Sequence, residues 1–262
     1  MAASFFERLI AWHKLPRLIG LLGLNRIRDR LRERNLHDTG KLPAVARPPL
    51  PAPTLEQTLG RTPNGTYNDL GSPRMGSAGS RFGRNIPLDR VVTAERAALL
   101  TPNPRTVSLE LMTRREFQPA TTLNLLAAAW IQFQVHDWFS HGHNEKENPI
   151  EVPLKEDDPW PERPMRVRRT GRDRTRPDGD TTQPPTFINT ETHWWDGSQL
   201  YGGDQATENL VRSFEDGRLK IGGDGLLPVD PQSGVDVTGV SGNWWVGLSL
   251  LHTVFTREHN AV

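Results

Sequence analysis

The chain has 262 residues, 35% of them hydrophobic and eight of them Trp, which is enough for a sizeable core in one or two domains. Its 32 basic and 31 acidic residues leave a formal net charge of +1, so we expect no nucleic-acid partner. Cysteine is absent, which excludes disulfides, thiolate nucleophiles and cysteine-ligated metals. Any metal must therefore use His, carboxylate, hydroxyl or carbonyl ligands.

The first elements are two amphipathic helices, predicted in residues 5–36 on either side of Pro16. The second carries apolar side chains among many arginines. Such a helix either packs on its own domain or lies on anionic lipid, and both readings stay open. No apolar run reaches the roughly 20 residues that span a bilayer, and the start lacks a secretory signal. We expect a cytoplasmic chain that is not secreted, with residues 1–39 as an N-terminal helical segment.

Long irregular segments follow, and they set the expected fold class. Residues 40–83 are rich in Pro and Gly and predict a long coil arm, whereas residues 106–118 predict a short helix. Residues 151–187 form a polar insertion with seven arginines between Arg163 and Arg176. Because no aromatic residues are interleaved with them, the arginines indicate a solvated loop. The pattern favours a mainly α fold with long coil arms and few strands.

The strongest helix prediction covers Pro119 to Phe139. It is apolar nearly all round, as expected of a central buried helix. Gln132 and His136, four residues apart, share one face, while Asp137 is turned about 100° from His136 around the axis. A buried imidazole or carboxylate is costly without a partner. These side chains are therefore either hydrogen-bonded core residues or ligands of a bound group.

A second polar pattern lies at residues 192–198. Thr192, Asp196 and Ser198 can project toward one point from a looped backbone, and the carbonyl of Trp194 can join them. Ca²⁺ takes six to eight oxygen ligands, and Asp137 could complete such a cage from the helix. Alone, this pattern is more often an ordinary polar turn; the HD dipeptide at residues 136–137 sharpens the calcium hypothesis.

Three ordered motifs carry a family resemblance: HDW in the helix, TxWxDxS followed by Tyr201-Gly202, and GLSLLHTVFTREHN from Gly247 to Asn260. Together they resemble the animal-type haem peroxidase and cyclooxygenase superfamily. The segments AWHKLP, RTPNGTYND, FGRNIP, HWWDGSQLYG and DGRLKIGGDGLLP resemble its fatty-acid alpha-dioxygenase branch. The similarity covers nearly the whole chain, and it implies a helical haem peroxidase-like domain over residues 40–262.

The resemblance also implies the roles of particular residues. His136 matches the distal haem histidine, and Gln132 lies beside it on the haem side. The residues that match calcium ligands are Asp137, Thr192, Trp194 through its carbonyl, Asp196 and Ser198. The calcium would be structural: it would hold the end of the helix, and so His136, in place.

Two departures from the mammalian peroxidases separate the branches. Those enzymes carry an acidic residue just before the distal histidine that esterifies the haem. Here Val135 stands at that position, so we expect haem b to be bound non-covalently. They also carry a distal arginine about eleven residues before the position of His252, where this chain reads Ser241-Gly242-Asn243. That difference argues against an efficient peroxidase that uses H₂O₂.

The alpha-dioxygenase resemblance implies an oxidoreductase of fatty-acid metabolism that adds O₂ to the carbon next to the carboxylate, giving 2-hydroperoxy acids and other oxylipins. A role in the response to oxidative stress goes with it. The family's proximal histidine, radical tyrosine and carboxylate-binding arginine lie beyond the EHN motif, so we expect this chain to be an incomplete domain that is inactive alone. Two alternatives remain: a non-catalytic calcium-binding derivative of the fold, and a haem peroxidase using H₂O₂.

Overall fold

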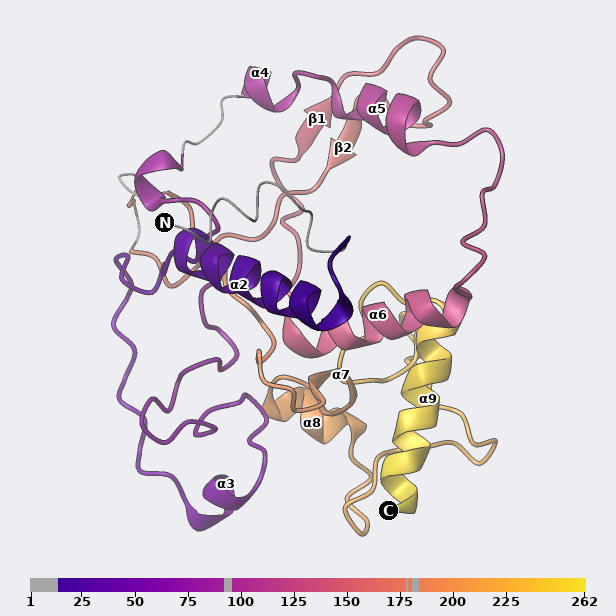
Figure 1. Cartoon of the computed structure of the whole chain (residues 1–262). Coiled ribbons are helices and arrows are strands. Elements are labelled where there is room, and N and C mark those ends of the chain that lie inside the picture. Colours follow the sequence, from indigo (N-terminus) through magenta and orange to yellow (C-terminus); the bar gives the residue numbers. More distant parts are fainter. Residues whose placement is uncertain (1–13, 92–95, 178, 181–183) are drawn as a thin grey trace.

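The computed structural model describes residues 14–91, 96–177, 179–180 and 184–262, and the fold is mainly helical with long coil segments, as the sequence predicts (Figure 1). Within these residues the helices are α2 (Arg17–Asn35), α3 (Leu55–Leu59), η2 (Leu88–Arg90), α4 (Arg96–Leu99), α5 (Pro104–Val107), η3 (Ser108–Met112), α6 (Leu125–Trp138), α7 (Ser198–Tyr201), α8 (Gln205–Val211) and α9 (Val246–Ala261). The strands are β1 (Ile150–Val152) and β2 (Met165–Val167).

Helix α6 begins at Leu125, so the prediction that the helix starts at Pro119 is wrong by six residues. Asn124 is the N-cap, and its side-chain oxygen accepts a hydrogen bond from the amide of Leu126. Such a cap satisfies one of the four amides that lack a partner at a helix start. The helix ends at Trp138 because Phe139 adopts an extended backbone conformation.

The expected all-round burial of α6 is also wrong. Ala129, Phe133, His136 and Asp137 are buried, whereas Leu125 is 75% exposed and Ile131 is 61% exposed. Only the face toward α9 and α7 is covered within the described residues. The exposed apolar face of α6 is typical of an interaction surface.

The core lies where α6 crosses α9 (Figure 1). The ring of Phe133 stacks on the ring of Phe255, with centroids 5.0 Å apart. The ring centroid of Trp130 lies 5.9 Å from that of Phe255. On α9 the buried residues are Leu248, His252, Thr253 and Thr256, a spacing that places them on one helical face. Burial therefore fixes which side of α9 contacts α6.

Coil segments occupy much of the remaining chain, as predicted for residues 40–83. The arm is attached to the polar insertion by Arg81, whose Nε donates to Asp173 at 2.7 Å with both side chains buried. Within the insertion, β1 and β2 form an antiparallel pair with Ile150 opposite Val167. The predicted solvated arginine loop is only partly correct, because Arg163 donates to the carbonyls of Lys155 and Asp158.

The predicted short helix at residues 106–118 is displaced toward the N-terminus. Asn103 caps α5 by accepting hydrogen bonds from two backbone amides, and α5 continues as the π-helical turn η3. The chain is then irregular from Thr113 to Asn124. The cap at Asn103 therefore sets the start of this helix.

The N-terminal prediction is tested only in its second half, because residues 1–13 lie outside the described part of the chain. After Pro16, α2 forms one helix. Its leucines include Leu18 and Leu22, which are 77% and 65% exposed, whereas Gly20 on the same helix is buried. No helix among these residues is both long and apolar enough to cross a bilayer.

The burial difference along α9 gives a test of the core. Leu248→Ala removes a side chain that is 1% exposed, and it should lower the free energy of unfolding by about 2–4 kcal/mol because a cavity remains. Leu250→Ala, on the 48% exposed side of the same helix, should cost less than about 1 kcal/mol. Urea denaturation followed by circular dichroism measures both. Equal losses would contradict the described orientation of α9.

Candidate functional site

A buried hydrogen bond joins α6 to a segment 61 residues later. The backbone amide of Ser198 donates to Oδ1 of Asp137 at 2.8 Å, and both residues are buried. A second link lies beside it, where the rings of Trp138 and Trp195 have centroids 4.8 Å apart. The end of α6 that carries His136 is thus fixed to the loop at residues 192–198.

Oxygen atoms gather at this link. The hydroxyl of Thr192 donates to Oδ2 of Asp196 at 2.7 Å, and the hydroxyl of Ser198 donates to Oδ1 of the same carboxylate at 2.7 Å. The two hydroxyl oxygens are 3.3 Å apart. The structure therefore brings together Asp137, Thr192, Asp196 and Ser198, four of the five residues that the sequence singled out for calcium.

Trp194 is the fifth of those residues. Its indole Nε1 donates to the carbonyl of Met75 at 3.1 Å, so its side chain contacts the arm that contains residues 40–83. Among the described residues, no group of three or more His, Cys, Asp or Glu side chains is arranged to hold a metal ion. A cation at this site would depend on the hydroxyls and on a backbone carbonyl in addition to the two carboxylates.

The carboxylates here are poorly compensated. Burial raises the pKa of Asp137, and the neighbouring Asp196 raises it further, against the hydrogen bond from Ser198. Glu191, which the sequence analysis missed, has its pKa raised to about 7 by burial and by Asp204 and Asp196. Its Oε2 is buried without a hydrogen-bond partner. An added positive charge would stabilise this cluster.

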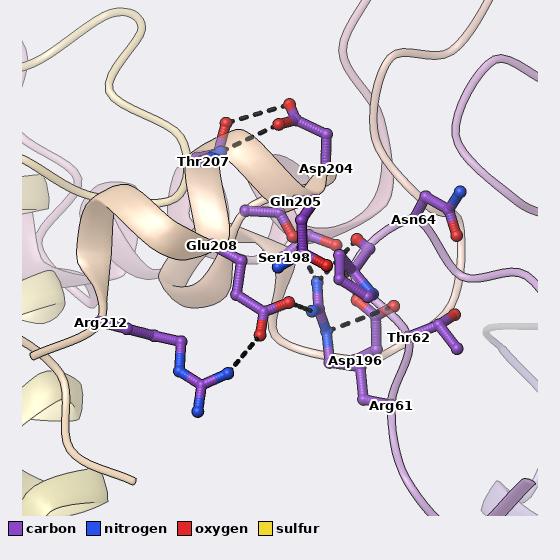
Figure 2. A network of polar contacts seen from close by, with 12 residues as sticks. Arg61, Thr62, Asn64, Asp196, Ser198, Asp204, Gln205, Thr207, Glu208 and Arg212 are labelled. Atoms are coloured by element: carbon purple, nitrogen blue, oxygen red, sulfur yellow. Dashed lines mark hydrogen bonds and ion pairs between the residues drawn. The ribbon is translucent and has the colours of Figure 1, made fainter. Parts of the chain in front are cut away.

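Arg61 is the cation that lies inside this acidic region (Figure 2). Its Nε lies 3.7 Å from Asp196 and its Nη1 lies 3.9 Å from Glu208. Nη2 donates to the carbonyl of Gly202, and the guanidinium lies 5.5 Å from the centroid of the Tyr201 ring. The sequence analysis used Arg61 only as part of a family motif, because these partners are 135 or more residues away and local patterns do not report them.

Gln132 and His136 lie side by side on α6, as predicted, with 3.5 Å between their Nε2 atoms. One side-chain group and one backbone group hold the Gln132 amide. Its Oε1 accepts from the indole of Trp245 at 2.8 Å, and its Nε2 donates to the carbonyl of Asn243 at 3.0 Å. The segment where mammalian peroxidases carry an arginine therefore contacts Gln132 directly. Sequence reasoning missed Trp245, whose only signal is its position just before a helix.

His136 is buried, and burial lowers its pKa. Its imidazole is therefore neutral near pH 7. The Nδ1 atom is buried without a hydrogen-bond partner in the described residues. A neutral imidazole next to a fixed amide can take up or release a proton on a ligand held against this face.

His259 has two structural partners. His259 Nε2 donates to the carbonyl of Gly217 at 3.1 Å, so its Nδ1 accepts from the hydroxyl of Tyr201 at 3.0 Å. This pairing holds α7 against α9 and explains Tyr201 as a packing residue. His141 and His143 are exposed.

Comparison with known proteins assigns the family. The family model for animal haem peroxidases matches residues 60–262, which include α6, the loop at residues 192–198 and α9. The chain belongs to the animal haem peroxidase family, so the resemblance inferred from the HDW, TxWxDxS and EHN motifs is confirmed.

Within this family, the chain is similar to alpha-dioxygenases. It is 37% identical to alpha-dioxygenase PIOX of Nicotiana tabacum, over 98% of this chain and 38% of that protein. It is also 37% identical to the Oryza sativa subsp. japonica protein of the same name, over 98% and 40%. The solved fatty acid alpha-dioxygenase structures from Oryza sativa and Arabidopsis thaliana have TM-scores of 0.79 and 0.80 at 35% and 33% identity. They match 99% of this chain and 40% and 39% of theirs, so the chain spans about two fifths of these relatives.

The position of Arg61 gives a test with a matched control. Arg61→Gln removes the cation that faces Asp196 and Glu208, and it should lower the free energy of unfolding by about 1–3 kcal/mol, because buried acceptors lose their donor. Arg212 pairs with the same Glu208 at 3.0 Å but is 40% exposed, so Arg212→Gln should cost less than about 1 kcal/mol. Denaturant titration without added metal compares the two. A larger loss for Arg212→Gln would contradict the assigned role of Arg61.

Proposed function

We propose that this chain is part of a haem-dependent fatty-acid alpha-dioxygenase, an oxidoreductase that adds O₂ to the carbon next to the carboxylate and yields a 2-hydroperoxy fatty acid. The observation that carries the proposal is the pair of Gln132 and His136 on one face of α6, in a chain similar to alpha-dioxygenases over nearly its whole length. Because the chain spans about two fifths of those relatives, the proposal concerns the activity of the whole polypeptide.

The residues present fit a haem on this side of α6. His136 is buried, and Gln132 is fixed beside its Nε2 by Trp245 and Asn243. Val135 precedes His136 and carries no carboxylate, which favours haem b bound without a covalent ester. When bound, the haem would supply the oxidising chemistry. The chain would supply a neutral imidazole and a fixed amide that orient groups at the haem face.

One variant tests the role of His136 in the reaction. In the haem-loaded polypeptide encoded by the reading frame that contains these residues, His136→Ala should lower the rate of O₂ uptake with palmitic acid by about 10²-fold or more, since acid–base groups contribute 10²–10⁴-fold. His141→Ala, at an exposed histidine close by, should leave the rate within about twofold. An oxygen electrode gives the rate, and mass spectrometry identifies the product.

Palmitic acid is the test substrate because the Oryza sativa structure is described with that ligand. Unchanged O₂ uptake in His136→Ala would contradict the assignment. Dye oxidation with H₂O₂ but no oxygenated fatty acid would favour a peroxidase instead. The contacts of Gln132 argue against that alternative, because residues 241–245 place a carbonyl and an indole, not a guanidinium, beside it.

We also propose that the loop at residues 192–198 binds a structural Ca²⁺. The support is the cluster of oxygen atoms from Asp137, Thr192, Asp196 and Ser198, together with the poorly compensated charge around it. The carbonyl of Trp194 would complete the set. Oxygen ligands of this kind and number suit Ca²⁺ rather than a softer metal.

Calcium titration tests this second proposal. Asp137→Ala should weaken Ca²⁺ binding by at least about tenfold because one of two carboxylate ligands is lost. Asp204→Ala is the control, since Asp204 is exposed and its side chain caps α8 through Thr207. The Ca²⁺ affinity of this variant should stay within about twofold of the wild-type value. Isothermal titration calorimetry measures both. Equal affinity in the wild-type chain and Asp137→Ala would overturn the site, and a chain that binds Ca²⁺ but no haem would favour the non-catalytic alternative.

The N-terminal segment leads to a proposal about location. We propose that the chain is cytoplasmic and that α2 contacts anionic lipid at the membrane surface. The support is that Leu18 and Leu22 are exposed on a helix with six arginines and two acidic residues, and apolar area and positive charge act together at a lipid surface. Sedimentation with phosphatidylserine vesicles tests it, and equal binding to neutral vesicles would contradict the charge contribution.

A further inference from the structure

Tyr201 belongs to a directional hydrogen-bond chain that the proposed function does not use. Its hydroxyl lies 3.0 Å from Nδ1 of His259, and Nε2 of the same imidazole lies 3.1 Å from the carbonyl oxygen of Gly217. Because a carbonyl can only accept, Nε2 carries the proton of the neutral imidazole and Nδ1 accepts from the phenol. The phenol proton of Tyr201 therefore lies against a basic nitrogen.

The second tyrosine of the chain has a different partner. The chain contains two tyrosines, and the hydroxyl of Tyr67, which is 6% exposed, donates to the carbonyl of Pro51 at 3.0 Å. A backbone carbonyl accepts a hydrogen bond but does not take up a proton, whereas an imidazole is a base near neutral pH. The two phenols thus differ in whether the hydrogen-bond partner can receive the proton itself.

The surroundings of Tyr201 favour loss of that proton together with an electron. Burial raises the pKa of the phenol against the effect of Arg61, so the phenol is protonated near pH 7. Removal of an electron alone would leave a positive charge on the ring, whose centroid lies 5.5 Å from the Arg61 guanidinium, and like charges repel. Transfer of the proton to His259 moves that charge onto an imidazole whose other N–H donates to Gly217.

We propose that Tyr201 and His259 form a redox-active pair. A one-electron oxidant takes an electron from Tyr201, the phenol O–H bond breaks, and the proton binds Nδ1 of His259. The products are a neutral tyrosyl radical, an imidazolium and the reduced oxidant, and return of the electron and the proton restores the phenol. Tyr201 is not the radical tyrosine that the family resemblance implies, since that residue lies beyond the EHN motif.

The position of the pair connects it to the proposed haem site. Tyr201 ends α7, which begins at Ser198, and the Ser198 amide binds Asp137 next to His136. His259 lies on α9, which packs on α6. In the whole polypeptide an oxidised haem would be the oxidant, and Tyr201 would hold the oxidising equivalent away from it; this use rests on the proposed function. The redox chemistry of the pair does not, because it depends only on α7 and α9.

The experiment uses the haem-free 262-residue chain at pH 8 with photochemically generated tris(bipyridine)ruthenium(III), an outer-sphere one-electron oxidant. Electron paramagnetic resonance of freeze-quenched samples detects the radicals. The chain also contains eight tryptophans, so ring-deuterated tyrosine is incorporated, which narrows a tyrosyl signal and leaves a tryptophanyl signal unchanged. We expect a tyrosyl radical in the wild-type chain. Oxidation confined to tryptophan would overturn the proposal.

The two tyrosines provide matched variants. Tyr201→Phe should lower the tyrosyl yield by about tenfold or more, because the remaining phenol lies against a carbonyl and lacks a positioned base. Tyr67→Phe should leave the yield within about twofold of the wild-type value. A radical that is lost in Tyr67→Phe and kept in Tyr201→Phe would overturn the proposal.

A variant of His259 separates proton transfer from hydrogen bonding. His259→Gln keeps an acceptor oxygen but no base, so the yield of the Tyr201 radical should fall by about tenfold or more. His141→Gln, at an exposed histidine, should leave the yield within about twofold. Circular dichroism confirms that both variants are folded. A merely structural His259 would give the same yield in both, and that result would overturn the proposal.

A second measurement needs no variant. The proton held on Nδ1 of His259 stays hydrogen-bonded to the phenoxyl oxygen, so electron–nuclear double resonance of the wild-type radical in D₂O should show a strongly coupled exchangeable deuteron. A tyrosyl radical without that coupling would overturn the proposal. Because no haem is present, these spectra are independent of the oxygenase assay. A chain that forms the radical, in a polypeptide that oxygenates no fatty acid, would disprove the proposed function and leave the pair intact.

Discussion

The hydrogen bond from the Ser198 amide to the buried carboxylate of Asp137 is the contact on which the site depends. It fixes the last turn of α6 to a loop that is distant in sequence, and His136 is the residue next to it. Most isolated helix ends fray, so an imidazole in a last turn has a defined position only when something holds that turn. Asp137 provides that restraint on one side of α6, and the aromatic contacts with α9 provide it on the other.

The same restraint creates an electrostatic problem. Asp137 and Asp196 are close together and little exposed, Glu191 lies nearby, and Arg61 is the cation that enters the region. Buried carboxylates are stable when paired or when they bind a metal. A divalent cation would relieve the repulsion, while Arg61 offsets part of it. The proposed calcium would thus act on haem chemistry only through the position of α6.

The sequence was sufficient to group the residues to which we assign the proposed chemistry. Helical spacing placed Gln132 and His136 on one face, and the alternation of oxygen-bearing residues indicated that Thr192, Asp196 and Ser198 converge. Both predictions rely on local geometry, which the sequence encodes directly. The link to Asp137 was a hypothesis raised by the HD dipeptide, and the family resemblance implied it as well.

What the sequence could not show depends on tertiary contacts. The predicted start of α6 was too early because the apolar pattern continues before the cap at Asn124. The predicted all-round burial was wrong because an apolar side chain is buried only where another part of the protein packs on it. Arg61, Trp245 and His252 contact the site from positions more than 100 residues away from their partners. No local pattern distinguishes them from ordinary packing residues.

Hydrogen exchange of the Ser198 amide tests the central claim most directly. If Asp137 accepts that amide in a buried position, the amide exchanges slowly in the wild-type chain and at least about tenfold faster in Asp137→Ala, because a buried hydrogen bond protects its donor. Asp204→Ala should leave the rate unchanged. Equal exchange rates at Ser198 in the wild-type chain and in Asp137→Ala would contradict the account, since the end of α6 would then be held by something else.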